Sequence, residues 1–330
     1  MLTAKDIRGL YAILPTPSKP GAERMDAERT VDLDETARLV ERLLGGGVSG
    51  LIVLGTTGEC ATLSHADYED FVACVLETAR RRMPVLVGTT ALGGHEVARR
   101  LKFIRDKGAD GTLLGLPMWQ PVTVPMAVNY YAEVSRLFPG LAVMVYANSR
   151  AFRFGFPMEF WEAVAKQAPT VTSAKFSRPK DLKQLISATG NRINFVPNES
   201  TVQNFFEVSP KTTTACWATA AGMGPEPALA IMHAVERGDA IAVAALAADI
   251  AWAHEPIKHI MADPEIFASY NIQVEKVRMD AAGYCKAGPI RPPYNHMPPD
   301  YEAGARECGR RWATLCAKYA GAVGRASERV

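Results

Sequence analysis

The chain has 330 residues, of which 48% are hydrophobic and 22% are charged, and its formal net charge is only +2. This composition is that of an ordinary globular protein, and the length suits one large α/β domain with an appendage or two small domains. Lysine and arginine are scattered along the chain, so we expect no nucleic-acid partner. The six cysteines form no Cys-X-X-Cys pair and no zinc-spaced cluster with histidine. We therefore expect no metal and a reducing, cytoplasmic location.

Two segments bear on membrane association. The first residues include Lys5, Asp6 and Arg8 and contain no apolar signal core. The alanine-rich stretch 228–253 is interrupted by charged residues and a glycine at 236–239. We therefore expect neither segment to enter a membrane.

Short apolar runs alternate with segments of helical periodicity along the first 240 residues. We expect strands at 11–15, 51–54, 84–90, 111–116, 142–146, 171–177, 193–196 and 213–217. We expect helices at 31–44, 65–82, 94–107, 125–137, 157–166, 182–188 and 225–237. The strand at 51–54 is continuously apolar, as parallel strands covered on both faces are.

This alternation predicts an α/β fold, a (β/α)8 TIM barrel over residues 1–240 that carries the active site. Residues 241–330 have helical character, with helices expected at 240–253, 274–286 and 299–319. We interpret them as a C-terminal helical appendage on the barrel.

One strand, 171–177, carries a lysine where an apolar residue is expected. Burying Lys175 as a cation is costly, and desolvation would lower its pKa and free the amine as a nucleophile. The alternative is a lysine that extends from the strand end to solvent.

Other chemically useful residues stand at strand ends, where the active site of such a barrel lies. The second strand runs into the loop 55–59, Gly-Thr-Thr-Gly-Glu, the fifth ends in Tyr146, Ala147 and Asn148, and the eighth carries Trp217. With Lys175, this set suits Schiff-base chemistry on a 2-oxo acid, with Tyr146 as the proton carrier. The loop can offer backbone N–H groups and two hydroxyls to the substrate carboxylate, from Gly55, Thr56 and Thr57.

Each of these features has a plainer alternative. The loop 55–59 can be a simple turn, Tyr146 a core tyrosine and Trp217 a packing residue. For Glu59 we expect a capping role at the segment that follows it, in place of a chemical one. His254 and His259 are five residues apart and lack a third ligand, so we interpret them as non-metal residues.

The loop 55–59, Tyr146 and Lys175, at these intervals, resemble the dihydrodipicolinate synthase/N-acetylneuraminate lyase superfamily of class I aldolases. Longer segments are similar to the hydratase-aldolases of polycyclic aromatic degradation, namely 30–37, 58–63, 116–119, 146–148 and 279–283. The resemblance implies a covalent Schiff base through Lys175, no cofactor, and a homotetramer. It also implies that Trp217 and Asn271 lie near the aryl group or the hydrating water.

The chain departs from dihydrodipicolinate synthase at two places. In the synthase the tyrosine is followed by Asn-X-Pro, whereas here Tyr146 is followed by Ala-Asn-Ser at 147–149. The second relay tyrosine of the synthase is replaced by Pro-Met-Trp at 117–119. Because the indole of Trp119 can only donate a hydrogen bond, we do not expect the proton relay of the synthase.

We therefore predict a hydratase-aldolase that converts an ortho-substituted benzalpyruvate and water to an aromatic aldehyde and pyruvate. Aromatic residues near strand ends, Trp119 and Trp217 among them, favour an aromatic substrate. Arg150 and Arg178 follow the fifth and sixth strands and could bind a second carboxylate, which favours trans-2'-carboxybenzalpyruvate, with 2-carboxybenzaldehyde as its product.

Alternatives remain at this stage. Both arginines could point to solvent. The substrate could be trans-o-hydroxybenzylidenepyruvate, giving salicylaldehyde, or the enzyme could be another pyruvate lyase or a dihydrodipicolinate-synthase-like enzyme. A non-catalytic 2-oxo-acid sensor on the same barrel is the non-enzyme alternative.

Overall fold

The computed structural model describes residues 1–327. Within that range, eight parallel strands form one sheet in the order β7-β6-β5-β4-β3-β2-β1-β8. They are β1 (Gly9–Ile13), β2 (Gly50–Val53), β3 (Val85–Gly88), β4 (Gly111–Leu114), β5 (Ala142–Tyr146), β6 (Val171–Lys175), β7 (Asn194–Val196) and β8 (Ala215–Ala218).

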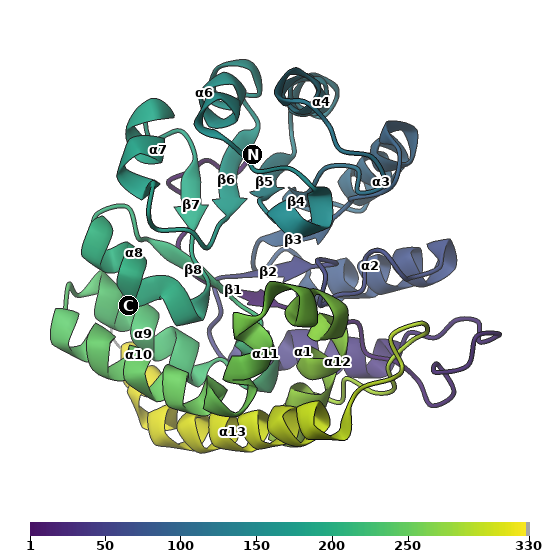
Figure 1. Cartoon of the computed structure of the whole chain (residues 1–330), viewed down its shortest axis with the longest axis vertical. Helices are drawn as coiled ribbons and strands as arrows, with labels where there is room; N and C mark the ends of the chain where they lie inside the picture. The colour runs from purple at the N-terminus through teal and green to yellow at the C-terminus, as the bar shows by residue number, and fades with distance from the viewer. Residues whose placement is uncertain (328–330) are drawn as a thin grey trace.

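The sheet curls into a nearly closed barrel. Strand β1 pairs with both β2 and β8. On the other side of β8, a parallel bridge joins Asn198 to Trp217, whose amide donates to the Pro197 carbonyl at 2.9 Å. The predicted (β/α)8 fold is therefore confirmed (Figure 1).

Helices cover the outside of the barrel (Figure 1). In chain order they are α1 (Leu33–Gly45), α2 (His65–Ala79), α3 (Gly94–Asp106), α4 (Val124–Leu137), α6 (Met158–Gln167), α7 (Leu182–Ala188), α8 (Val202–Val208) and α9 (Glu226–Glu236), and a short helix, α5 (Ser149–Phe152), lies in the loop between β5 and α6. Two 3-10 turns, η1 (Glu199–Thr201) and η2 (Ala220–Met223), follow β7 and β8. Every residue of β2, β3, β4 and β5 is buried, as expected for parallel strands covered on both faces.

The C-terminal segment, residues 241–327, is helical. It comprises most of α10 (Ala240–His254), then η3 (Glu255–Ile257), α11 (Lys258–Ala262), α12 (Pro264–Ala282) and α13 (Pro299–Ser327). Helix α13 runs along α10 and α12 and also packs on α9 (Figure 1). The buried Trp312 fixes it there, because its indole donates to the Gly224 carbonyl at 2.9 Å.

The structure differs from the predicted helix boundaries at several places, most of all at the start of α12. Helix α12 begins at Pro264, ten residues before the expected start at 274. The start signal is local: the Asp263 carboxylate accepts from the Glu265 and Ile266 amides, and Pro264 occupies the first turn. The short helices α5 and α8 were not expected.

The apolar run that begins with α10 is longer than we expected from the sequence, because no charged residues interrupt it at 236–239. Residues Ala240–Ala262 are long and apolar enough to cross a membrane by length and composition alone. The charged break at 236–239 precedes this run and does not interrupt it. In the structure the buried residues of α10, Val243, Leu246 and Ile250 among them, belong to the hydrophobic core, and the helix packs on α9 and α13.

Candidate active site

Lys175 and Tyr146 stand side by side at the ends of two neighbouring strands. They are register partners in the pairing of β5 with β6. The Lys175 Nζ atom lies 4.7 Å from the centre of the Tyr146 ring and 3.3 Å from the centre of the Trp217 ring on β8. The amine is therefore enclosed by two aromatic faces at the C-terminal end of the barrel.

These surroundings determine the protonation of Lys175. Burial lowers the pKa of its ammonium, because the charged form loses hydration. The effect is opposed by Tyr146, Glu199 and Glu275, whose negative forms would favour the cation. The net direction is downward, so a larger fraction of Lys175 is the neutral, nucleophilic amine near neutral pH.

The turn after β2 is tightly built. Leu54 and Glu59 both adopt positive φ, 59° and 60°, an unusual conformation for residues other than glycine. A Cβ atom on Gly58 would lie 2.6 Å from the Leu54 nitrogen, and one on Gly88 of β3 would lie 1.9 Å from the Leu54 carbonyl oxygen. The two glycines therefore allow the turn to fold back on itself and against β3.

This turn reaches the tyrosine. The Thr56 Oγ1 atom lies 2.8 Å from the Tyr146 hydroxyl, so the two groups share a hydrogen bond. Gly55 adjoins the same tyrosine, because a Cβ atom there would lie 3.9 Å from Cε1 of its ring. Thr57, the next residue after Thr56 in the sequence, is also buried. The structure thus brings Lys175, Tyr146, Trp217 and Thr56 together.

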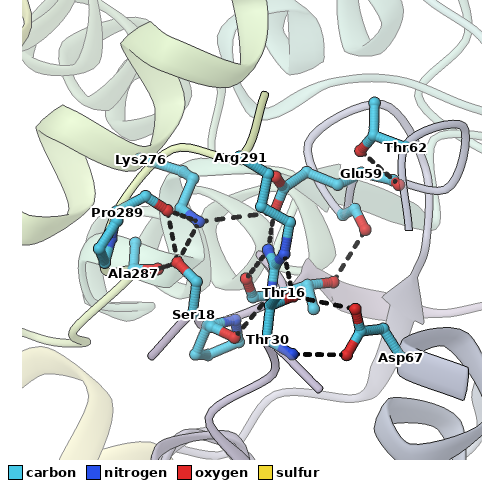
Figure 2. Close-up of polar contacts among 12 residues, drawn as sticks. Thr16, Ser18, Thr30, Glu59, Thr62, Asp67, Lys276, Ala287, Pro289 and Arg291 are labelled. Atoms are coloured by element: carbon cyan, nitrogen blue, oxygen red, sulfur yellow. Dashed lines mark hydrogen bonds and ion pairs between the residues drawn. The ribbon is translucent and has the colours of Figure 1, made fainter. Parts of the chain in front are cut away.

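Glu59 does not have the expected capping role. Helix α2 is capped by Ser64, whose hydroxyl accepts from the Asp67 amide at 3.1 Å. The Glu59 carboxylate instead points to the C-terminal segment, where it binds Arg291 and Lys276 (Figure 2). The sequence interpretation considered only neighbours along the chain, whereas both partners are more than 200 residues away.

Asn271 lies on α12, which packs against η2 after β8. Within the part of the chain that the structure describes, its buried Oδ1 atom accepts no hydrogen bond. Glu275, one helical turn further on, is near enough to raise the pKa of Lys175. Residues four apart share a helix face, so Asn271 lies on the same face of α12 as Glu275.

A second buried polar cluster was missed by sequence reasoning. The Arg278 guanidinium is 2.6 Å from the Glu275 carboxylate and 3.2 Å from His254 Nε2. Burial, with a smaller contribution from Arg278, lowers the pKa of His254 to about 3. Glu199 on η1 is also buried, and burial raises the pKa of its carboxyl to about 7 against the opposing effect of Arg278. His254 is thus neutral and Glu199 titrates near neutral pH.

Four other candidates lie toward the rim. The Asn148 side chain caps α5 by accepting from the Ala151 amide at 3.2 Å. The Arg150 guanidinium donates to the Pro264 carbonyl, and that of Arg178 donates to the Gly155 carbonyl at 3.2 Å. Trp119 is 78% exposed. The Asn148 amide also donates to the Tyr146 carbonyl at 2.9 Å, whereas in the described residues no hydrogen bond joins the other three to Lys175 or Tyr146.

The residues present set the chemistry. Among those the structure describes, no group of three or more His, Cys, Asp and Glu side chains could hold a metal ion. A desolvated amine can attack a ketone carbon and form an iminium, which withdraws electrons from the adjacent carbon–carbon bond. The hydroxyl pair of Tyr146 and Thr56 can move a proton next to that carbon.

Comparison with known proteins identifies the family of this chain. The model of the dihydrodipicolinate synthetase family matches residues 21–301. The trans-o-hydroxybenzylidenepyruvate hydratase-aldolase of Pseudomonas putida is 44% identical over 322 residues, which are 96% of each chain. The trans-2'-carboxybenzalpyruvate hydratase-aldolase of Nocardioides sp. strain KP7 is 37% identical over 322 residues, again 96% of each.

Solved structures are similar over the same length. One, described as PhdJ bound to substrate intermediate, is 34% identical and superposes with a TM-score of 0.93 over 96% of this chain and 99% of that chain. The dihydrodipicolinate synthase of Agrobacterium tumefaciens strain C58 is 21% identical, with a TM-score of 0.78 over 94% of this chain and 99% of that chain, and it shares the fold.

Proposed function

The chain belongs to the dihydrodipicolinate synthetase family and, within it, to the hydratase-aldolases, and we propose that it cleaves an ortho-substituted benzalpyruvate. It is a carbon–carbon lyase. Class I aldolases of this family use a lysine Schiff base and no external cofactor. The observation that carries the proposal is the placement of the Lys175 amine beside Tyr146, whose hydroxyl is bonded to Thr56.

The reaction begins at the ketone. The Lys175 amine attacks C2 of the substrate, and loss of water gives an iminium that is conjugated with the side-chain alkene. Water then adds to the carbon that bears the aryl group: its hydroxyl stays on that carbon, and its remaining proton goes to C3, which restores the iminium. Trp217, which flanks the amine, is positioned to adjoin the aryl group, and the unpartnered Asn271 Oδ1 supports a role for that residue near the hydrating water.

Cleavage follows from the same iminium. Tyr146, which gave its proton to the hydroxide that left C2 and is then a phenolate, accepts the proton of the new hydroxyl. The carbon–carbon bond breaks, and the electron pair of that bond moves into the iminium to give an enamine. The aromatic aldehyde leaves. Protonation of the enamine and hydrolysis of the imine then release pyruvate and free Lys175. Thr56 and Thr57, with Gly55, hold the pyruvyl carboxylate throughout.

For the ortho substituent we propose a carboxylate, so that the substrate is trans-2'-carboxybenzalpyruvate and the aldehyde is 2-carboxybenzaldehyde. The rim arginines Arg150 and Arg178 support this choice, since each uses a donor on a main-chain carbonyl and a guanidinium has further donors to offer. Asn148 and the exposed Trp119 complete the proposed substrate-binding set. The hydroxyl analogue is the alternative, because the hydratase-aldolases similar to this chain include both named types.

We also propose that the enzyme acts in aromatic hydrocarbon degradation, as a homotetramer in the cytoplasm, with a barrel unit to residue 240 and a helical unit beyond it. The tetramer and the pathway rest on the family resemblance. The cytoplasmic location is supported by the six cysteines, all of which are free thiols in the structure.

The proposal is tested with purified enzyme and a panel of benzalpyruvates that carry carboxyl, hydroxyl or hydrogen at the ortho position. Aldehyde and pyruvate should appear in equal amounts, with the largest kcat/KM for the carboxyl compound. A larger kcat/KM for the hydroxyl compound would select the alternative substrate. Release of neither product from any member of the panel would refute the hydratase-aldolase assignment.

A further inference from the structure

The Glu59 carboxylate is enclosed by two cations that come from the far end of the chain. Its Oε2 atom lies 2.6 Å from Arg291 Nη1 and 3.5 Å from Lys276 Nζ. All three side chains are at most 5% exposed. A second carboxylate, Asp67, reaches Arg291 through Thr30, which hydrogen-bonds to both. The charges of this buried cluster are thereby balanced.

The Glu59 backbone is part of the turn that carries Thr56. The Glu59 amide donates to the Thr56 carbonyl at 2.9 Å, and the Thr16 hydroxyl donates to the Gly58 carbonyl at 2.8 Å. Because Glu59 and Leu54 both have positive φ, the turn is unfavourable unless its surroundings hold it. Glu59 is therefore joined to Thr56 directly through its own main chain.

The two cations fix the C-terminal segment to the barrel at the same point. Lys276 Nζ donates to Ser18 Oγ and to the Pro289 carbonyl, each at 2.8 Å. The Arg291 guanidinium donates at 3.1 Å to the Thr16 carbonyl. Figure 2 shows both side chains approaching Glu59 from this segment. Buried ion pairs add little net stability, so stabilisation alone explains the cluster poorly.

We propose that Glu59, held by Arg291 and Lys276, is the positioning residue of the turn that binds the substrate carboxylate. The C-terminal segment is then part of the machinery that selects 2-oxo acids over neutral ketones. This inference rests on the proposed function, in which Thr56 and Thr57 bind the carboxylate and Lys175 forms the imine.

The test compares two small ketones, pyruvate and pyruvamide, which differ in the charge next to the ketone. The rate of irreversible trapping on full-length enzyme with cyanoborohydride is measured for each, and their ratio reports carboxylate recognition. In Glu59→Gln and Arg291→Lys, displacement of the turn should lower this ratio about tenfold or more, the loss expected for one hydrogen bond to a charged group. A variant that is only less stable would lose both rates in parallel.

Glu35→Gln is the matched control. Glu35 is also a buried glutamate that ties the C-terminal segment to the barrel, since it accepts from the Lys286 amide at 2.6 Å, but it does so on α1 and away from the turn. This variant should melt at a lower temperature and keep the wild-type ratio. If Glu59→Gln does not yield folded protein, the trapping ratio of Arg291→Lys alone tests the inference.

The outcomes separate the inference from its premise. Wild-type enzyme that is not trapped by pyruvate at all would refute the proposed function. Trapping without preference for pyruvate over pyruvamide would overturn the carboxylate role of the turn and the inference with it. A wild-type preference that persists in both variants, or that Glu35→Gln loses equally, would overturn the inference alone.

Discussion

The Tyr146 hydroxyl lies 2.8 Å from the Thr56 hydroxyl, so the end of β5 is hydrogen-bonded to the turn after β2. This bond holds the proposed proton carrier next to the proposed carboxylate-binding turn. The ring itself is fixed separately, by an edge-on contact with Phe152 at 5.3 Å between ring centres. Loss of the hydroxyl should therefore leave the ring in place.

Tyr146→Phe should keep imine formation and lose cleavage. Removing a general acid–base group costs roughly 10²–10⁴-fold in rate. Trapping by pyruvate and aldehyde release are measured on the same preparation. Tyr131→Phe is the control, because its buried hydroxyl also makes a 2.8 Å hydrogen bond, to Leu114, on the outer face of the barrel. A near-wild-type turnover number in Tyr146→Phe would remove the residue from the mechanism.

The pH dependence of imine formation should reveal the desolvated amine. Only the neutral amine is nucleophilic, and burial lowers the pKa of Lys175 from its ordinary value of 10.5. The rate of trapping by pyruvate and cyanoborohydride should therefore rise with pH and reach its plateau below pH 10.5. A rate that continues to rise through pH 10.5, as for a solvated lysine, would contradict the burial of the amine.

The rim arginines should distinguish the two candidate substrates. A charge-assisted contact is worth about 1.5–3 kcal/mol, or roughly 10–150-fold in kcat/KM. Arg150→Ala or Arg178→Ala should lower kcat/KM for the carboxyl substrate by that factor and leave the hydroxyl analogue little changed. A parallel loss on both substrates would assign these arginines to holding their loops, through the carbonyls of Pro264 and Gly155.

Glu199 should make stability fall as pH rises. Burial raises the pKa of its carboxyl from 4.5 to about 7, so between these values the folded protein retains a proton that the unfolded chain has lost. The free energy of unfolding then decreases with pH across this window, by at most about 3 kcal/mol from this group.

The measurement for Glu199 is the difference in unfolding free energy between wild type and Glu199→Gln at pH 5 and pH 8. Glutamine cannot ionise, so the variant should gain stability relative to wild type at the higher pH. A difference that is the same at both pH values would show that Glu199 is already charged in the folded protein at pH 5, as it is in the unfolded chain, and that its pKa is not raised.

The barrel could be predicted from the sequence because its signals are local. Continuous apolar runs mark the strands, and an unexpected lysine in the sixth is visible without any partner. The placement of Tyr146 beside Lys175 followed from the rule that parallel strands end at one mouth. The start of α12 also had a local signal in Asp263 and Pro264, which was overlooked.

Other features have no local signal. The role of Glu59 depends on Arg291 and Lys276, which only the fold brings to it. The raised pKa of Glu199 depends on burial, and that follows from η1 lying against β8 and α10. Sequence patterns identify a strand or helix and its buried face. They do not identify the partners of a buried charge, because those partners are distant in the sequence and only the tertiary structure brings them into contact.

The most direct test of the account is the site of covalent attachment. Enzyme incubated with pyruvate and sodium borohydride should gain one reduced pyruvyl group, and peptide mass spectrometry should place it on Lys175. Lys175→Ala should gain none. Labelling on another lysine, or labelling that persists unchanged in Lys175→Ala, would contradict the Schiff-base mechanism.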